Sequence, residues 1–361
     1  MTETVRLQDI ADRAGVSRAT VSLALRHHAS IPVATRTRIQ KLAEELGYRP
    51  NPLVSALMRH HRSTRAIRPT HLTLALVLKF SRRDAWQKYL SPDLMSGAGR
   101  RAEQLGYRLE EFWIDDLGLS DTRLGNVLFS RNVPGLIVAP LPAAVGQLRL
   151  AWEKFSAVAI GYSLACPQLH RVTTDRYEAM LLAVRELRRR GRRRIGLALD
   201  ANQDARVHHQ WVAAFLWEQT QSRPADRIPL LVAKDRQWTE RRFAAWFQQN
   251  KPEAILGYDT RIVAWLKNLK RSIPHDTTFV HLWNPETNGG FAGLYHHPPE
   301  IGAAAVDYLV SLIQRNERGI PKSPHTLQLE ASWTDGATAI ASGVKNPPRF
   351  TEASQTPDSG R

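Results

Sequence analysis

Two kinds of hydrophobic pattern divide the chain. In the first fifty residues, apolar positions recur every three or four residues, which is the spacing typical of amphipathic helices. From Leu72 onward, short continuous apolar runs alternate with helix-length amphipathic segments. This change predicts a small all-helical domain followed by a larger α/β part.

The first pattern predicts three short helices. Gly15 is suited to end the first helix because glycine readily adopts a left-handed backbone, and Ser17 is suited to cap the second. Pro32 fits at or just before the start of the third helix. The apolar positions of the three helices are Leu7, Ile10, Ala11 and Ala14, then Val21 and Leu25, then Ile39, Leu42 and Leu46. Two short helices joined by so tight a turn predict a helix-turn-helix, whose second helix enters the major groove of DNA.

Charge and exposed side chains bear on whether this is only a generic three-helix bundle. The 361 residues carry a formal net charge of +16, and residues 1–68 hold 12 basic against 5 acidic residues. Charge alone would fit a solvated basic face as well as a polyanion-binding one. The exposed positions of the second helix are suited to phosphate and base contacts, which favours DNA binding; they are Ser17, Arg18, Ala19, Thr20 and Ser22.

A short helical segment follows the three helices. Residues 51–58 begin with Asn51 as a cap and Pro52 at the first helical position, and Leu53 and Leu57 lie one turn apart. A basic linker runs from His60 to Pro69. We therefore expect a hinge segment over residues 51–70 between a headpiece, residues 1–50, and the rest of the chain.

The α/β part predicts doubly wound parallel sheets. Strands are expected at residues 72–78, 135–139, 157–161, 194–199, 254–257 and 278–281. A helix is expected from about Pro92 to Gly106, and another between the second and third of these strands. Because the length exceeds one such sheet, we expect two similar lobes over residues 71–344, with a cleft between them and ligands at the carboxyl ends of strands. The Pro-, Ser- and Thr-rich residues 345–361 predict a disordered tail without the leucine heptads of a tetramerisation helix.

The N-terminal residues resemble a known family. The stretch "LQDIADRAGVSRATVSLAL…TRTRIQKLAEELGYRPN" is similar to the lactose-repressor (LacI/GalR) family of bacterial transcription regulators. The resemblance implies that Arg18 and Ala19 read bases, that Ser17, Thr20 and Ser22 lie near phosphates, and that the segment after "YRPN" forms a hinge helix on operator DNA, with Leu57 wedged into the minor groove. Leu23 and Arg6 depart from the family pattern, so the operator sequence cannot be copied from a relative.

A weaker resemblance continues to about residue 340. The segments "RVTTDRYEAMLLAVRELRRRGRRRIGLAL" and "PEIGAAAVDYLVSLIQRNERGIPKSP" are similar to the family's two-lobed, periplasmic-binding-protein-like core, which implies an effector cleft. By position, the effector contacts would be Asp175, Arg206, Trp238, Tyr258 and Asn284. Tyr258 stands where many members have Asn, and Trp283-Asn284 replaces an acidic sugar-binding residue. For each of these residues, packing within a lobe or a surface salt bridge is an equally open interpretation.

Enzymatic chemistry finds little support in the sequence. The single cysteine, Cys166, permits no intrachain disulfide and argues against a structural zinc site, and no HExxH spacing exists. The Gly161-Tyr-Ser163 stretch lacks the second glycine of a nucleophile elbow. The six arginines between Arg188 and Arg194 are either a second DNA contact or, as we favour, a basic helix C-terminus. We expect no metal, no cofactor and no enzyme.

These patterns lead to one functional hypothesis and two alternatives. The first is a cytoplasmic repressor that binds a palindromic DNA operator as a homodimer and responds to a small molecule, a sugar or a derivative of one. The second is a DNA-binding regulator with a vestigial cleft, controlled by a protein partner or constitutive. The third is a carbohydrate-binding transport protein, which the intact headpiece and the absence of a signal peptide or membrane span disfavour.

Overall fold

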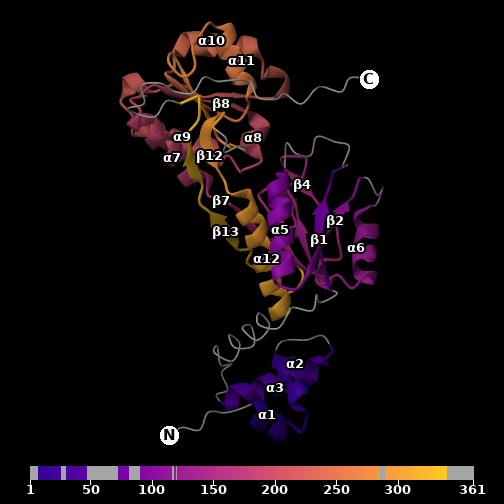
Figure 1. Cartoon of the computed structure of the whole chain (residues 1–361). Coiled ribbons are helices and arrows are strands. Elements are labelled where there is room, and N and C mark those ends of the chain that lie inside the picture. The colour runs from indigo at the N-terminus through magenta and orange to yellow at the C-terminus, as the bar shows by residue number, and fades with distance from the viewer. Residues whose placement is uncertain are drawn as a thin grey trace.

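A computed structural model shows a helical headpiece and two α/β lobes (Figure 1). It describes residues 7–25, 30–46, 72–80, 90–115, 118, 120–284 and 289–339. The predicted hinge segment, with Asn51, Leu53 and Leu57, and the predicted tail lie outside these ranges.

The headpiece is a three-helix unit, as predicted. It comprises α1 (Leu7–Ala14), α2 (Arg18–Leu25) and α3 (Val33–Glu45). Gly15 has a φ of 64°, and the Ser17 Oγ accepts a hydrogen bond from the Thr20 amide at 3.1 Å. The turn and the cap therefore form as the sequence indicated. Its core consists of buried side chains from all three helices, namely Ile10, Ala11, Val21, Ala24, Ile39 and Ala43.

The first lobe, here called the N-lobe, is a parallel sheet covered by helices on both faces. Its strand order is β13-β7-β5-β3-β1-β2, and every adjacent pair is parallel. The strands are β1 (Thr73–Leu78), β2 (Arg108–Trp113), β3 (Gly135–Val138), β5 (Ser156–Ile160), β7 (His170–Thr174) and β13 (Thr326–Leu329). Helices α5 (Pro92–Gln104) and α12 (Pro298–Arg315) pack on the face that bears Leu74, Leu76 and Leu78. Helix α6 (Asp121–Ser130) packs on the opposite face.

The helix expected between β3 and β5 does not form, so that prediction was wrong. The segment instead holds β4 (Gly146–Gln147), which pairs with β6 (Leu164–Cys166), and one 3-10 turn, η2 (Trp152–Lys154). The Gly146 amide donates to the Ser163 carbonyl at 2.7 Å, and the Leu148 amide donates to the Cys166 carbonyl at 3.1 Å. These strand-like bonds take the donors that a helix would have used, in a stretch where prolines already limit helix formation.

The second lobe, here called the C-lobe, repeats the architecture. Its strand order is β14-β12-β11-β10-β8-β9, parallel except for β14 against β12. The strands are β8 (Ile195–Asp200), β9 (Leu231–Ala233), β10 (Ala254–Gly257), β11 (Thr278–His281), β12 (Ala292–Tyr295) and β14 (Ser332–Thr334). One face is covered by α7 (Arg176–Arg189) and α9 (Gln210–Thr220), the other by α10 (Glu240–Asn250) and α11 (Arg261–Asn268). Shorter helical segments are α8 (Ala201–Ala205), η3 (Pro224–Asp226) and η4 (Asp235–Gln237).

Three chain crossings join the lobes in the described part of the chain. The chain passes from β7 to α7, returns from β12 to α12, and passes again from β13 to β14 (Figure 1). Neither lobe is therefore one continuous segment. The expectation of two similar doubly wound lobes is confirmed.

Candidate DNA-binding and interlobe sites

The outer side of α2 is the candidate DNA-binding surface. Val21 and Ala24 of this helix are fully buried, whereas Ser17 and Arg18 are exposed at its beginning. The Ser17 hydroxyl also lies 2.8 Å from the Thr20 hydroxyl, so the two hydroxyls form the helix cap together. Arg18 is thus the long side chain at the start of the helix. The side chains of Ala19 and Ser22 lie outside the described residues.

The lobes contact each other through Arg206 and Tyr162. Arg206, which ends α8 in the C-lobe, donates to the carbonyl oxygens of Pro142 and Leu141 in the N-lobe, at 2.8 and 2.7 Å. Tyr162 follows β5 of the N-lobe, and its hydroxyl accepts a hydrogen bond from the Gln210 amide of the C-lobe at 3.3 Å. The Tyr162 ring also lies 4.6 Å from the His208 ring. Polar and aromatic groups from both lobes thus meet at this boundary.

Arg176 also lies at this boundary. It is the first residue of α7, directly after the crossing from β7, and is only 8% exposed. Its guanidinium donates to the Thr173 hydroxyl at 2.8 Å and the Thr174 carbonyl at 3.3 Å, and lies 5.9 Å from the Trp283 ring. Burial lowers the pKa of Arg176 to about 10, although nearby Tyr258 and Tyr162 act in the opposite direction. Sequence reasoning did not select this residue.

A buried aromatic stack lies beside Arg176. The rings of Trp283 and His296 are 4.4 Å apart and nearly parallel, at 11°. The His296 Nε2 lies 2.8 Å from the Leu282 carbonyl, and its Nδ1 has no partner among the described residues. Burial lowers the pKa of His296 to about 3, and Arg176 acts in the same direction. His296 is therefore a neutral ring at physiological pH.

We call the group formed by Tyr162, Arg171, Thr174, Arg176, Tyr258 and Trp283 the interlobe site. Its members follow or end strands β5, β7, β10 and β11, with the exception of Arg171, which lies within β7. In open parallel sheets, ligands bind at the carboxyl ends of strands. The site therefore lies where the fold places ligands.

The five residues predicted to contact an effector have different environments. Arg206 and Tyr258 lie at the boundary, and Tyr258 is an electrostatic neighbour of Arg176. Asp175 caps α7, because its carboxylate accepts a hydrogen bond from the Glu178 amide at 3.0 Å. Trp238 is 5% exposed in the C-lobe core and donates from its indole to Asp259 at 2.8 Å. Asn284 is 2% exposed and donates to the Phe291 carbonyl and the Thr334 hydroxyl, at 2.9 and 2.8 Å.

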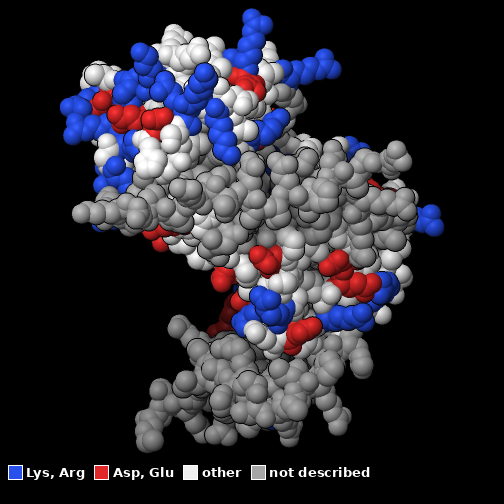
Figure 2. Space-filling model, turned by 45° about the horizontal axis from the view of Figure 1, so that its top comes forward, with Lys and Arg blue, Asp and Glu red and all other residues white. Residues whose placement is uncertain are grey.

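The arginine-rich stretch after α7 makes contacts within the C-lobe. Arg188 pairs with Glu218, and Arg190 pairs with Glu186 and Asp335. Arg192 donates to the carbonyls of Pro274 and His275, and Arg194 donates to the carbonyls of Lys251 and Ala225. Figure 2 shows that basic side chains on this end of the molecule are interspersed with acidic ones. These bonds support the interpretation as a basic helix C-terminus rather than a second DNA contact.

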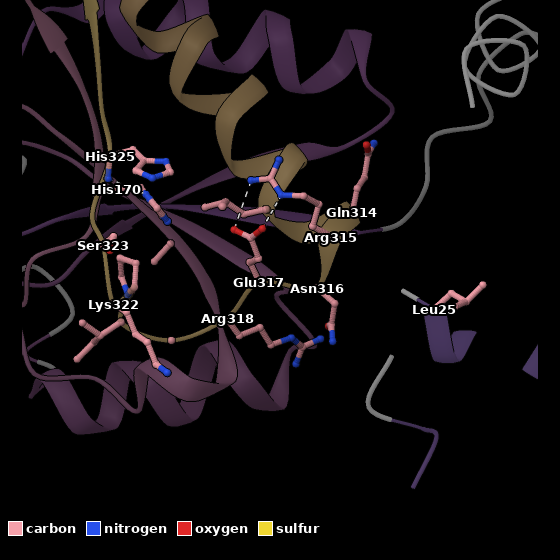
Figure 3. A pocket seen from close by; sticks show the side chains of 15 residues that line it. Leu25, His170, Gln314, Arg315, Asn316, Glu317, Arg318, Lys322, Ser323 and His325 are labelled. Atoms are coloured by element: carbon pink, nitrogen blue, oxygen red, sulfur yellow. Dashed lines mark hydrogen bonds and ion pairs between the residues drawn. The ribbon is translucent and has the colours of Figure 1, made fainter. Parts of the chain in front are cut away.

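A cavity lies at the C-terminal end of α12, apart from the interlobe site. It is a cavity of about 890 Å³, bordered by the residues from Gln314 to Ser323 together with His170 and His325 (Figure 3). Arg315 and Glu317 form an ion pair there at 2.6 Å, and the Tyr308 hydroxyl lies 3.0 Å from the His170 Nδ1. Arg318 and Lys322 also border the cavity, so it is a basic pocket in its own right.

No group of three or more His, Cys, Asp or Glu side chains in the described ranges is arranged to hold a metal ion. No helix among them has the length and hydrophobicity needed to cross a membrane.

The helix-turn-helix headpiece and the two-lobed core both have counterparts among known transcriptional regulators. Residues 6–51 match the family model described as "Bacterial regulatory proteins, lacI family". The chain is 31% identical over 212 residues to the HTH-type transcriptional regulator PtxS of Pseudomonas plecoglossicida, an alignment that covers 58% of each protein. The chain is therefore similar to regulators of the lacI family in its headpiece, and it spans little more than half the length of the PtxS regulator that it matches.

Solved structures confirm the fold over nearly the whole chain. A complex of the transcriptional regulator CelR with cellobiose superimposes with a TM-score of 0.52 at 18% identity, covering 93% of this chain and all of that one. A lac repressor dimer bound to operator and the anti-inducer ONPF gives 0.51 at 17% identity, covering 94% and 100%. At this identity the likeness establishes the architecture alone.

Proposed function

We propose that the protein is a transcriptional repressor that binds a two-fold-symmetric DNA operator as a homodimer and is controlled by a small molecule held between its lobes. The observation that carries the proposal is the headpiece, in which α2 is capped at Ser17 and presents Arg18 outward beside a tight turn. The lac repressor dimer that shares the fold is bound to an operator. Because the target is DNA, we place the protein in the bacterial cytoplasm.

The interlobe site supports control by a ligand. The lobes are joined by three chain crossings and by hydrogen bonds of single side chains such as Arg206, so a ligand between them can change their relative position. Such a change would move the headpieces of a dimer and alter their fit to two half-sites. The effector is proposed as a carbohydrate or derivative, since the CelR structure that shares the fold holds cellobiose.

The test is selection of the operator from random DNA with the full-length protein. We expect the selected sequences to contain an inverted repeat, and a DNA fragment with both halves to bind far more tightly than a fragment with one. Equal affinity for an isolated half-site, or selection of no common sequence, would overturn the proposal.

The alternative of a regulator without a small-molecule effector is favoured by one observation. Trp238 and Asn284, two of the five predicted effector contacts, have their hydrogen bonds inside the C-lobe. Thermal-shift screening against sugars and nucleotides separates the two cases, because a ligand at 100 times its dissociation constant stabilises the folded state by about 2.7 kcal/mol.

A further inference from the structure

Two buried arginines of the interlobe site have no acidic partner among the residues that the structure describes. Arg171 is 6% exposed and Arg176 is 8% exposed. The hydrogen bonds of their guanidinium groups are with neutral oxygens: Arg171 with the Gly161 carbonyl at 3.4 Å, and Arg176 with the Thr173 hydroxyl and the Thr174 carbonyl. Within the described ranges neither forms an ion pair. A buried cation is costly unless an opposite charge lies beside it, so this arrangement requires explanation.

The surrounding charges do not supply the missing anion. Asp175 is adjacent to Arg176 and raises its pKa slightly, but it forms no ion pair with it among the described contacts, because its carboxylate accepts the Glu178 amide as the cap of α7. Asp259 is held by Arg261 and by the Trp238 indole. Arg176 is also the first residue of a 14-residue helix, where the helix dipole disfavours a cation and favours an anion. Burial and the dipole of α7 therefore both disfavour the positive charge of Arg176.

The two arginines face the same part of the boundary. The guanidinium of Arg171 lies 5.0 Å from the Tyr162 ring, and Tyr162 is also an electrostatic neighbour of Arg176. Arg206 of the C-lobe is close enough to influence Arg176 as well. Basic groups from both lobes thus converge near Tyr162.

Uncharged polar atoms next to these arginines also lack partners. The Thr174 hydroxyl and the Gln210 side-chain carbonyl are buried without a hydrogen bond to any described residue. Thr174 precedes Arg176 by two residues, and Gln210 bonds Tyr162 through its amide nitrogen. Buried polar atoms normally have hydrogen-bond partners. Atoms without one, close to an unpaired charge, indicate a place where a ligand would supply the partners.

We infer that the interlobe site binds a small polyhydroxylated anion, a sugar acid or a sugar phosphate, with its negative group on Arg176 and Arg171 and its hydroxyls on Thr174 and Gln210. The inference rests on the proposed function, whose effector it narrows from carbohydrates in general to anionic ones. Arginine binds carboxylates and phosphates through paired N–H donors, so both kinds of anion share the required chemistry.

The test compares anionic sugars with their neutral parents on the full-length protein. The probes are the uronates, aldonates and 6-phosphates of glucose, galactose and mannose, the three parent sugars, and inorganic phosphate, each followed by thermal shift and calorimetric titration. We expect at least one anion to raise the melting temperature and its neutral parent to bind at least 100-fold more weakly. The carboxylate and phosphate arms identify which anion is used. A parent sugar that binds as tightly as its acid, or a panel without any stabilising anion, would overturn the inference.

Variants locate the bound charge. In Arg176→Gln the stabilisation by the anion should disappear, and in Arg176→Lys affinity should fall at least tenfold, because lysine keeps the charge but lacks the planar fork. Arg123→Gln changes an exposed arginine of α6 and should retain the full response. Lys322→Gln changes the basic pocket of Figure 3 and should also retain it. Loss of the response in Lys322→Gln but not in Arg176→Gln would move the anion to that pocket and refute the assignment.

A ligand-free measurement provides a second, independent criterion. Arg176→Met removes a buried charge that has no partner, so the free protein should melt at the same temperature or higher. A merely structural arginine would give a lower melting temperature, and that result would count against the inference. Operator binding by the unliganded wild-type protein is measured in parallel: operator binding without anion binding refutes only this inference, and anion binding without operator binding refutes only the proposed function.

Discussion

At the scale of single residues, the base specificity of the headpiece depends on what Arg18 contacts. Its neighbours Ser17 and Thr20 are tied together in the helix cap, so Arg18 is the long donor left at the exposed start of α2. Arginine binds the O6 and N7 of guanine through two donors, a contact that distinguishes one base pair from the others.

We therefore predict that Arg18→Ala weakens operator binding by about 1–3 kcal/mol and relaxes preference at one base pair in each half-site. Quantitative binding to the selected operator and to its single-base variants measures both effects. A uniform loss across all sequences would instead assign Arg18 to a phosphate.

Two buried histidines predict how stability depends on pH. Burial lowers the pKa of His296 to about 3 and that of His281 to about 4. Both are normal bases in the unfolded chain, which therefore binds more protons than the folded protein at pH values below about 6.5. Folding stability is complete above that pH and should be lost as the pH falls toward 4, by about 1.4 kcal/mol per pH unit for each histidine.

Chemical denaturation at several pH values measures this slope. His296→Gln should reduce the slope between pH 6.5 and 4 by about 1.4 kcal/mol per pH unit, the contribution of one proton. Glutamine keeps a donor for the Leu282 carbonyl but does not titrate. His275→Gln, at an exposed position, is the matched control and should leave the slope unchanged. Equal slopes in all three proteins would show that His296 is not kept neutral by burial.

At the scale of elements, α5 and α12 pack backbone to backbone. A side chain on Gly97 of α5 would overlap the Pro299 backbone, and one on Gly302 of α12 would overlap the Leu94 carbonyl. Gly99 lies on the same helix as Gly97, yet nothing lies within 4 Å of the position that its side chain would occupy. The two helices can approach closely only because glycines lie at their crossing.

This difference gives a paired test within one helix. Gly97→Ala should destabilise the protein by about 1–3 kcal/mol or more, because the helices must separate. Gly99→Ala should be neutral or stabilising by up to about 1 kcal/mol, since alanine is the better helix former. Chemical denaturation gives the free energy of unfolding of both variants. A similar loss of stability in the two would contradict the close crossing of α5 and α12.

The strands differ in how well the sequence predicts them. The central strands β10 and β11 are continuous apolar runs, buried on both faces, and they lie where the sequence placed them. The edge strand β2 (RLEEFW) and the edge strand β13 are partly or largely exposed, so they lack such a run and were not predicted. Apolar periodicity reports burial, and an edge strand held by backbone bonds leaves little of that signal.

The interlobe site was predicted less completely than the fold. Arg206 and Tyr258 were placed there by resemblance, but Arg171 and Arg176 were not, because a buried arginine has the same sequence appearance as a surface one. Arg176 is buried beside Trp283, which lies far from it along the chain. The one local signal is a basic residue at the start of a helix, where acidic residues are usual.

At the scale of the whole molecule, DNA binding by a dimer would be dominated by phosphate contacts. The chain has a formal net charge of +16, and residues 1–68 hold 12 basic residues. We predict that affinity for the operator falls on the order of a thousandfold between about 50 and 200 mM salt, as expected for six or more phosphate contacts. Titrations at several salt concentrations measure the slope, and a flat response would exclude the proposed mode of binding.

The three crossings between the lobes have a consequence for synthesis on the ribosome. The N-lobe strands from β1 to β7 are made first, but α12 and β13, which complete that lobe, are made only after most of the C-lobe. At about 5–20 residues per second, the delay is on the order of ten seconds. During that interval the apolar side chains Leu74, Leu76 and Leu78 of β1 have no α12 to cover them. The nascent chain therefore passes through a period in which the first lobe is aggregation-prone, and chaperones would be needed most while the second lobe is being translated.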